Sequence, residues 1–377
     1  MGAFSIIRRV PAMTVTIVND HPFQTGLGRY AEILYNYVSN LGNFKFNFYS
    51  ISIGYRHSAS SYPGDVIFSK FDSWLNQKFP FVRDFPDVSH YIESRFLTHF
   101  INKNSNFLDR ESIFDSVIHY TNPGIYPVRT NSKTIVTIHD LLFLRKHGFK
   151  NSLGDINNKR YLGLFKEVPY VITFTKEVKY ELEEQGFTSS IEIIPPSISN
   201  SFHPIQVSKE LIRHKLSLPK DKTLILSVSS NRPGKNLKTI EEVMESLGEG
   251  YQLVRVGSPL AGSITFTKVS DETLNEIYNA CDILIFPSTE EGVGLPVIEA
   301  FAVGLPVVAS DIEVMREVCK EAAILVEPEK SALAASIKEA IDNKENLIKK
   351  GLVRSLYFSK ERFIKEMRSF YERVCFE

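Results

Sequence analysis

The apolar residues in the first half of this chain alternate between short runs and longer stretches with helical spacing. Residues 13–19 are predicted to form a strand, and the stretch after them places apolar side chains on one helical face: Tyr30, Ile33, Leu34, Tyr37, Val38 and Leu41. Further strand-like runs follow at 44–51, 114–119, 134–138, 170–174 and 191–194. Strands that alternate with helices predict a parallel sheet with helices on both faces.

The same alternation begins again after a proline-rich break. Pro195-Pro196 and Phe202-His203-Pro204 interrupt regular structure, so we place a domain boundary near residues 196–210. The strand-like runs of the second series are residues 223–228, 252–256, 282–286, 306–309 and 323–326. A chain of 377 residues also exceeds the size at which one hydrophobic core keeps growing. Two α/β domains that face one another predict a cleft, the usual place for a ligand.

Composition narrows the class of protein without naming a function. The chain has 44 Lys and Arg residues against 44 Asp and Glu residues, so no overall field draws it to nucleic acid. Its three cysteines are far apart and lack metal-ligand spacing, which is typical of thiols in a reducing compartment. No apolar run has the length of a membrane span, and the N-terminus lacks a signal-peptide core. We therefore expect a cytoplasmic protein without a metal site.

Residues 287–300 carry the strongest chemical signal of the chain. They follow an apolar run and open a short helical pattern that stops at Gly304. A glycine-containing loop before a helix presents free backbone N–H groups and the positive helix end, which suits a phosphate. Glu291 and Glu299 flank this loop as acceptors for hydroxyl groups. With Pro296 at the first helical position, Glu299 is expected in the first turn, and the pattern predicts a nucleotide-sugar site.

A second glycine pair, Gly26 and Gly28, follows the first predicted strand. With Ala31 it matches G-x-G-x-x-A, the pattern of a dinucleotide-binding turn. That interpretation requires an acidic residue at the end of the next strand, where this chain has Ser50-Ile51-Ser52. A dehydrogenase is therefore disfavoured. A close backbone approach to another phosphate or a sugar, or a simple turn at a helix start, stays open.

Two further loops follow predicted strands. His139 lies at the end of the run 134–138, where an open α/β sheet points side chains into its ligand crevice, although a packed structural histidine fits as well. Neither a nucleophile elbow nor a pair of metal-ligand histidines accompanies it, which disfavours hydrolases. Arg232 and Lys235 follow the run 223–228. They are either solvated surface cations or the groups that neutralise a diphosphate.

Together these segments resemble the retaining glycosyltransferases of family four, which have the GT-B fold of two facing Rossmann-like domains. The similar segments are the glycine pair (25–30), the histidine-bearing strand end (137–141), the entry to the hinge (194–204), the helix before the signature (270–282) and the paired-glutamate signature (291–299). The signature is specific, and the order of the other segments supports it.

The resemblance implies a role for each candidate residue. Glu299 would hold the ribose hydroxyls of the donor, and Glu291 the hydroxyls of the transferred sugar. Lys235 would neutralise the diphosphate, with Arg232 as a second cation, and His139 would face the donor sugar. The remaining donor-binding positions would act through the backbone: Gly26, Gly28, Gly292, Val293, Gly294 and Leu295.

Two positions depart from the family pattern. The family commonly has Gly-Arg five residues before its lysine, and here Ser229-Ser230 stands there, which leaves Arg232 as the nearest arginine. Val293 replaces a common aromatic residue, which changes the shape of the pocket more than its chemistry.

The resemblance predicts transfer of a hexose, of the mannose or glucose type, from a GDP- or UDP-sugar with retention of configuration and without a metal or other cofactor. The acceptor would be a glycan, a lipid-linked sugar or a protein. The domains would be residues 1–198 on the acceptor side, 199–358 on the donor side and a helix over 359–377 that crosses back. A sugar-nucleotide epimerase and a catalytically idle sugar-nucleotide-binding protein are the alternatives.

Residues 71–110 depart from the alternating pattern, because many aromatic side chains occur there among scattered charges. These residues are Phe71, Trp74, Phe79, Phe81, Phe85, Tyr91, Phe96, Phe100 and Phe107. One interpretation is an insertion buried on its own domain, since aromatic residues dominate core burial. The other is a surface that binds the acceptor or makes a peripheral contact with a membrane.

Overall fold

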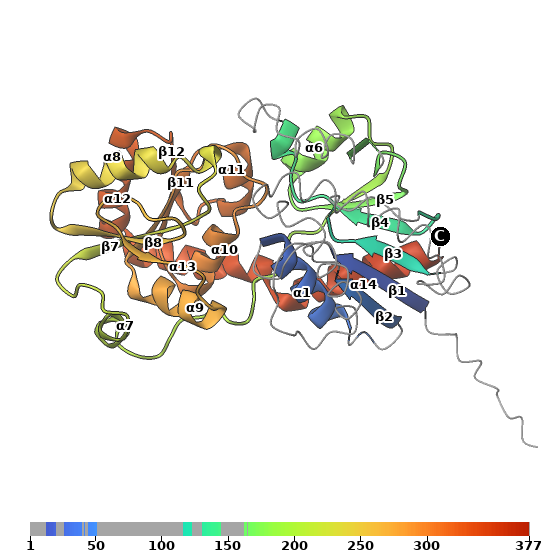
Figure 1. Cartoon of the computed structure of the whole chain (residues 1–377), viewed down its shortest axis with the longest axis horizontal. Coiled ribbons are helices and arrows are strands. Elements are labelled where there is room, and N and C mark those ends of the chain that lie inside the picture. The colour runs from blue at the N-terminus through green and yellow to red at the C-terminus, as the bar shows by residue number, and fades with distance from the viewer. Residues whose placement is uncertain are drawn as a thin grey trace, which may run out of the picture.

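The computed structural model describes residues 13–19, 26–39, 41, 44–50, 116–122, 130–144, 162–163 and 165–376. These residues form two six-stranded sheets, in which all the paired strands are parallel. Figure 1 shows one sheet in each of two domains that lie side by side. The predicted parallel α/β architecture is confirmed. The aromatic segment 71–110, with both of its interpretations, lies outside the described residues.

The N-terminal sheet has the strand order β2-β1-β3-β4-β5-β6. Its strands are β1 (Met13–Asn19), β2 (Phe44–Ser50), β3 (Val117–Tyr120), β4 (Thr134–Thr137), β5 (Tyr170–Thr173) and β6 (Ser190–Ile193). Each overlaps a run that the hydrophobic pattern predicts. Strands β3, β4 and β5 are buried at every position, as parallel strands covered on both faces must be.

The C-terminal sheet has the order β12-β11-β10-β7-β8-β9. Its strands are β7 (Thr223–Val228), β8 (Tyr251–Val256), β9 (Ile264–Phe266), β10 (Ile283–Phe286), β11 (Val307–Ser310) and β12 (Ile324–Val326). The pattern predicts all of them except β9. That strand is a half-buried edge strand of three residues, too short to show a period.

Helices connect the strands and cover the sheets. In the N-terminal domain these are α1 (Gly26–Val38), the short helix η2 (Leu142–Leu144) and α6 (Lys176–Glu184). The C-terminal domain contains α7 (Lys209–Lys215), η3 (Pro233–Lys235), α8 (Leu237–Leu247), α9 (Asp271–Ala280), α10 (Leu295–Val303), α11 (Glu313–Cys319), α12 (Lys330–Asp342) and α13 (Lys344–Ser355). The chain ends in η4 (Leu356–Phe358) and α14 (Lys360–Phe376).

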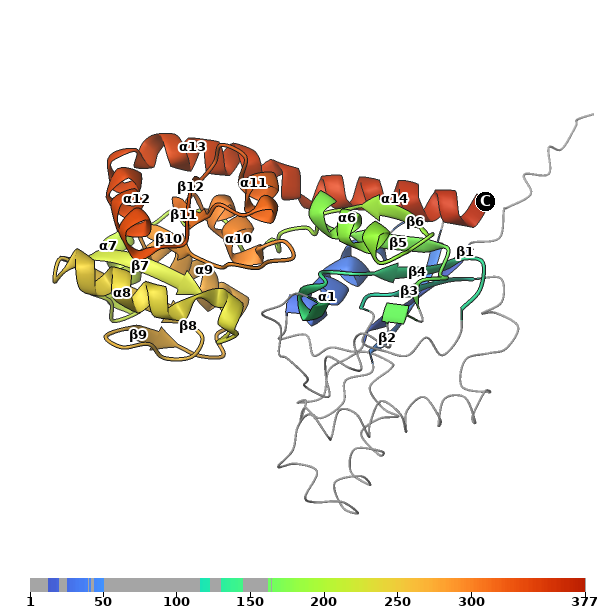
Figure 2. The same ribbon diagram turned by 90° about the horizontal axis from the view of Figure 1, so that it is seen from above.

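Helix α14 belongs by its packing to the N-terminal domain, although it ends the chain. Figure 2 shows it continuing from α13 and running along the N-terminal sheet, and it contacts α1 and β3. Its Tyr371 hydroxyl lies 2.7 Å from Nδ1 of His119 on β3. Burial, together with a smaller effect of His139, lowers the pKa of His119 to about 3, so this ring is neutral and part of the core.

The chain crosses between the domains twice, and the two crossings are bonded to each other. The Ile198 amide donates to the Phe358 carbonyl over 2.9 Å, and Arg362 donates to the Pro195 carbonyl over 2.7 Å. The paired crossings fix where one domain meets the other.

Among the described residues, no helix is long and apolar enough to cross a membrane. The same residues contain no group of three or more His, Cys, Asp or Glu side chains that could hold a metal ion. Cys281, Cys319 and Cys375 are free thiols inside the protein.

Candidate functional site

The topology of the C-terminal sheet selects the place where its loops can bind a ligand. Strand β7 lies between β10 and β8, so the direction of the strand order reverses there. In open α/β sheets, ligands bind outside the carboxyl ends of the strands at such a point. Residues 229–236 follow β7 and residues 287–294 follow β10. The Thr289 amide joins the two loops by donating to the Gly234 carbonyl over 2.8 Å.

Lys235 and Glu291 form a direct ion pair at this point. Lys235 is the last residue of η3, and its Nζ donates to Oε1 of Glu291. The lysine side chain is 18% exposed and the glutamate side chain 8%, so both charges are largely removed from water. The ammonium group also lies 5.6 Å from the centre of the Phe286 ring, on β10. Two of the predicted catalytic residues are thus brought together from different loops.

Arg232 is not part of this pair. Its backbone begins η3, while its side chain is exposed and makes no hydrogen bond or ion pair with the described residues. Arg232 nevertheless lies beside the site, because its carbonyl accepts a hydrogen bond of 3.0 Å from the Lys235 amide. Its role as a second cation therefore stays a prediction.

A buried arginine that the sequence analysis missed donates hydrogen bonds to the loop that follows β7. Arg255, the fifth of the six residues of β8, has no exposed surface. Its guanidinium donates to the Ser227 carbonyl (3.2 Å), the Ser229 carbonyl (2.6 Å) and the Ser230 carbonyl (3.4 Å). The backbone at the position of the family's Gly-Arg pair is therefore held by a cation from the neighbouring strand. A single charged residue within the predicted strand-like run 252–256 was the available signal.

The signature loop ends in a strained glycine where α10 begins. Gly294 has φ +76° and ψ 56°, and a Cβ there would lie 2.6 Å from the Met315 methyl group. Only glycine adopts this left-handed geometry without strain. The helix begins at Leu295, so Pro296 is its second residue rather than its first. Glu299 is its fifth residue, and the expectation that Glu299 lies in the first turn is wrong.

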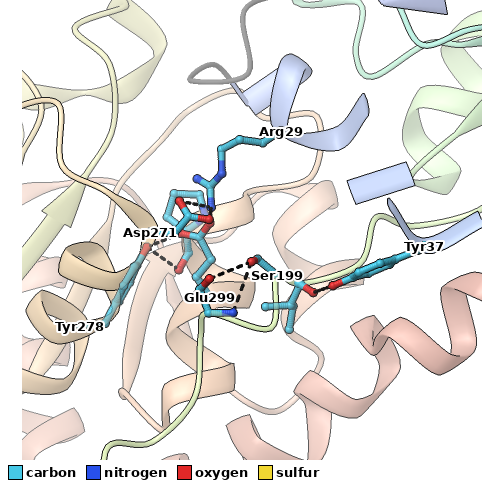
Figure 3. Close-up of polar contacts among 9 residues, drawn as sticks. Arg29, Tyr37, Ser199, Asp271, Tyr278 and Glu299 are labelled. Carbon is cyan, nitrogen blue, oxygen red and sulfur yellow. Dashed lines mark hydrogen bonds and ion pairs between the residues drawn. The ribbon is translucent and has the colours of Figure 1, made fainter. Parts of the chain in front are cut away.

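Glu299 is buried and bonded through both carboxylate oxygens. Its Oε2 accepts a hydrogen bond of 2.8 Å from the Tyr278 hydroxyl on α9, and Oε1 accepts one of 3.1 Å from Arg29 on α1. Figure 3 shows the two donors approaching the carboxylate from different domains. Burial raises the pKa of Glu299, and the Arg29 charge and the Tyr278 hydrogen bond oppose that shift.

The predicted glycine pair lies inside a helix rather than in a loop. Gly26 is the first residue of α1 and Gly28 the third, so both contribute to the first helical turn. The N-terminus of a helix is a place where backbone amides can bind an anion. The structure agrees with the interpretation of a turn at a helix start, and binding of a phosphate or a sugar by this glycine pair stays a prediction.

His139 lies in the N-terminal domain against the signature loop. Its Nε2 donates to the Thr121 carbonyl over 2.7 Å, which places a proton on Nε2. The ring packs edge-on against Tyr30 and Phe174, with centroid distances of 5.0 and 4.7 Å. The His139 carbonyl would lie only 2.6 Å from a Cβ at Gly292, so the two loops meet backbone to backbone.

This close approach predicts the effect of Gly292→Ala. The added methyl group would meet the His139 carbonyl at 2.6 Å and Asp140 Cβ at 2.9 Å, closer than real contacts allow. Because both obstacles belong to the other domain, we expect the variant to fold but to hold its domains further apart. Turnover should fall by about tenfold or more, since a small misplacement of reacting groups lowers the reaction rate strongly. Small-angle scattering and turnover measure the two effects, and a variant with unchanged values of both contradicts the prediction.

The remaining signature residues lie where the loop meets the helix. Val293 is buried, with 8% of its surface exposed, and Leu295 starts α10. The structure therefore gathers Lys235, Glu291 and the residues 292–295 at one edge of the sheet, with His139 against them. Glu299 lies further along α10 beside Tyr278.

The geometry agrees with a family match over the same part of the chain. Residues 208–351 match the family described as Glycosyl transferases group 1. This segment is therefore similar to a group 1 glycosyl transferase domain. The predicted resemblance to glycosyltransferases is thereby confirmed, whereas the assignment to family four and retention of configuration stay predictions.

Curated proteins similar to this chain are named as glycosyltransferases. The putative teichuronic acid biosynthesis glycosyltransferase TuaC of Bacillus subtilis is 29% identical over 216 residues, 54% of this chain and 54% of TuaC. The serotype-specific mannosyltransferase WbdA of Escherichia coli is 27% identical over 224 residues, 49% of this chain and 26% of WbdA. The aligned region thus spans about half of TuaC and about a quarter of WbdA.

Solved structures share the fold over nearly the whole chain. Sucrose-phosphate synthase of Thermosynechococcus elongatus superposes with a TM-score of 0.70 at 18% identity, over 96% of this chain and 99% of that one. HepE of Anabaena, solved in complex with UDP-glucose, gives a TM-score of 0.66 at 12% identity, over 96% and 100%. With two parallel-sheet domains, the chain has the predicted GT-B fold.

Proposed function

We propose that this protein transfers a hexose from a nucleotide-diphosphate sugar to a glycan acceptor, with retention of configuration. The Lys235–Glu291 pair at the switch point of the group 1 domain carries this proposal. A cation and a hydroxyl acceptor lie side by side there, as a sugar diphosphate requires. TuaC, named for teichuronic acid biosynthesis, and WbdA, named as a serotype-specific mannosyltransferase, support a glycan acceptor, and HepE, solved with UDP-glucose, supports a nucleotide sugar as donor.

Lys235 and Glu291 would bind different parts of the donor. The diphosphate would take the Lys235 ammonium group as its counterion, because a phosphate carries more charge than a carboxylate. Glu291, released from Lys235, would accept hydrogen bonds from hydroxyls of the sugar. Glu299 would accept from the ribose, and the backbone of Gly292, Val293, Gly294 and Leu295 would face the sugar and its phosphate.

The transfer itself would need no nucleophile from the protein. As the bond from the anomeric carbon to the diphosphate oxygen breaks, Lys235 stabilises the charge that develops on the leaving group. The acceptor hydroxyl attacks from the same face and gives its proton to the departing diphosphate. Arg232 would add a second charge there, and the contact of His139 with Gly292 would close the reacting face to water. We propose that these cations replace a metal.

A panel of nucleotide sugars tests the proposal. We expect a GDP- or UDP-hexose to raise the melting temperature, since a ligand at a hundredfold its dissociation constant stabilises a protein by roughly 2.7 kcal/mol. The stabilising donor should then yield a transferred sugar whose anomeric configuration, read by NMR, equals that of the donor, with a rate that EDTA leaves unchanged. Stabilisation by no donor would overturn the proposal. Isomerised donor in the absence of acceptor would indicate an epimerase, and binding without turnover an idle binding protein.

A further inference from the structure

Arg29 crosses from the N-terminal domain to the buried carboxylate of Glu299. Its Nη2 lies 3.1 Å from Oε1 of Glu299 and 3.3 Å from the carboxylate of Asp271 on α9. Its guanidinium carbon lies 5.5 Å from the centre of the Phe202 ring, in the segment that links the domains. Figure 3 shows Arg29 reaching from α1 toward these carboxylates. The arginine side chain is 22% exposed and the Glu299 side chain 7%.

Arg29 is the cation that balances the charge of Glu299 among the described residues around it. From α9, Asp271 adds a second negative charge and Tyr278 donates a neutral hydrogen bond. From α1, Glu32 adds negative charge beside Arg29 and Asp271. Burial and Asp271 both raise the pKa of Glu299, and the Arg29 charge is the largest opposing influence. Within the described part of the chain, the charge that remains near Glu299 without Arg29 would be negative.

We propose that Arg29 is a positioning residue for the nucleotide: it keeps Glu299 ionised across the domain boundary, so that this carboxylate can accept the ribose hydroxyls. The inference rests on the proposed function. An ionised carboxylate offers about four acceptor positions and no donor. Arg29 and Tyr278 occupy one position on each oxygen, which leaves an acceptor position on each for two neighbouring hydroxyls. A protonated Glu299 would lose this pattern.

The inference couples nucleotide binding to the arrangement of the domains. Arg29 and Glu299 are separated by 270 positions in the sequence and meet only where the domains meet. A nucleotide that binds the ionised carboxylate therefore favours the joined arrangement, and the joined arrangement favours the nucleotide, as linkage requires.

The experiment is a calorimetric titration with UDP and with GDP between about pH 5.5 and 8.5, a range above the ordinary pKa of glutamate. Wild-type affinity gives the reference profile, which includes the titration of the terminal phosphate of the nucleotide near pH 6. In Arg29→Gln the pKa of Glu299 rises further, so affinity relative to wild type should fall as pH falls, approaching tenfold per pH unit below that pKa, and recover at high pH. Arg29→Lys should restore part of the wild-type profile. In the double variant with Glu299→Gln this additional pH dependence should disappear.

Arg316→Gln is the matched control, because Arg316 is an exposed arginine paired with Asp311 away from this contact. It should titrate like wild type, and melting curves show that each variant is folded. A loss of affinity in Arg29→Gln that is equal at all pH values overturns the inference, as does a gain in affinity, which would mean that Arg29 competes with the ribose. Wild-type protein that binds neither nucleotide would overturn the proposed function itself.

Discussion

Replacing Lys235 by methionine is expected to slow sugar transfer by about 10²–10³-fold, the usual loss when one group that stabilises developing charge is removed. The Lys235 ammonium group is mostly buried between Glu291 and the Phe286 ring, and methionine fills a similar volume without the charge. Because the charge on the diphosphate grows as the bond breaks, kcat should fall more than the affinity for the donor. Steady-state kinetics with the stabilising donor measure both quantities.

Glu291 provides the internal check on this result. Lys235→Met leaves the largely buried Glu291 side chain, 8% exposed in the wild type, without its cation, so the single variant should also melt earlier. The double variant with Glu291→Gln should recover stability but not turnover. Lys238→Met is the matched control, since Lys238 follows the same loop with a side chain that is 87% exposed. Turnover within a few-fold of wild type in Lys235→Met would show that the lysine does not act on the leaving group.

The second large effect is expected for Arg255→Leu, in the free energy of unfolding. The substitution removes the donor from the buried carbonyl of Ser227 and from the more exposed carbonyls of Ser229 and Ser230. An unsatisfied buried group costs about 1–3 kcal/mol, and the half-buried carbonyl adds to this, so we expect a loss of about 2–4 kcal/mol, measured by urea denaturation. Turnover should fall as well, because these carbonyls hold the loop that ends at Lys235.

Charge and geometry at Arg255 can be separated by Arg255→Lys. Burial lowers the pKa of the Arg255 guanidinium to about 10, so the group is charged at neutral pH. Lysine keeps the charge but lacks the planar guanidinium group that reaches several carbonyls. The free energy of unfolding of Arg255→Lys should therefore lie between the values for wild type and for Arg255→Leu. Arg373→Leu, at an exposed arginine, should change stability by about 0.5 kcal/mol or less. An unfolding free energy near wild type for Arg255→Leu would contradict the account of the loop.

The pattern of apolar residues predicted most of the strands and helices, because each of them depends on a short stretch of sequence. The buried strand β10 appears as an uninterrupted apolar run, and Gly304 ends α10 in the left-handed conformation that its position suggested. The edge strand β9 was not predicted, because three half-buried residues are too few to show a hydrophobic period. The predicted position of Glu299 was wrong by one residue, because the helix begins at Leu295, one position before Pro296, and Glu299 therefore falls beyond its first turn.

Contacts between distant residues required the three-dimensional structure. The sequence marked Lys235 and Glu291 as candidates, but their pairing joins positions 56 residues apart. Arg255 was passed over because its partners are backbone carbonyls of another strand, which no residue type reveals. Arg29 stood next to a noted glycine and was still missed, because its partner belongs to the other domain.

The sequence by itself determined the two series of parallel strands, the glycine-containing signature from Glu291 to Glu299 and the identity of the charged residues around it, since hydrophobic period and residue type are local properties. The tertiary structure alone decided which charges neutralise one another: Glu291 with Lys235, Glu299 with Arg29, and Arg255 with backbone carbonyls. Burial strengthens an electrostatic interaction and makes an unpaired charge costly, and burial is set by how the sheets and domains pack.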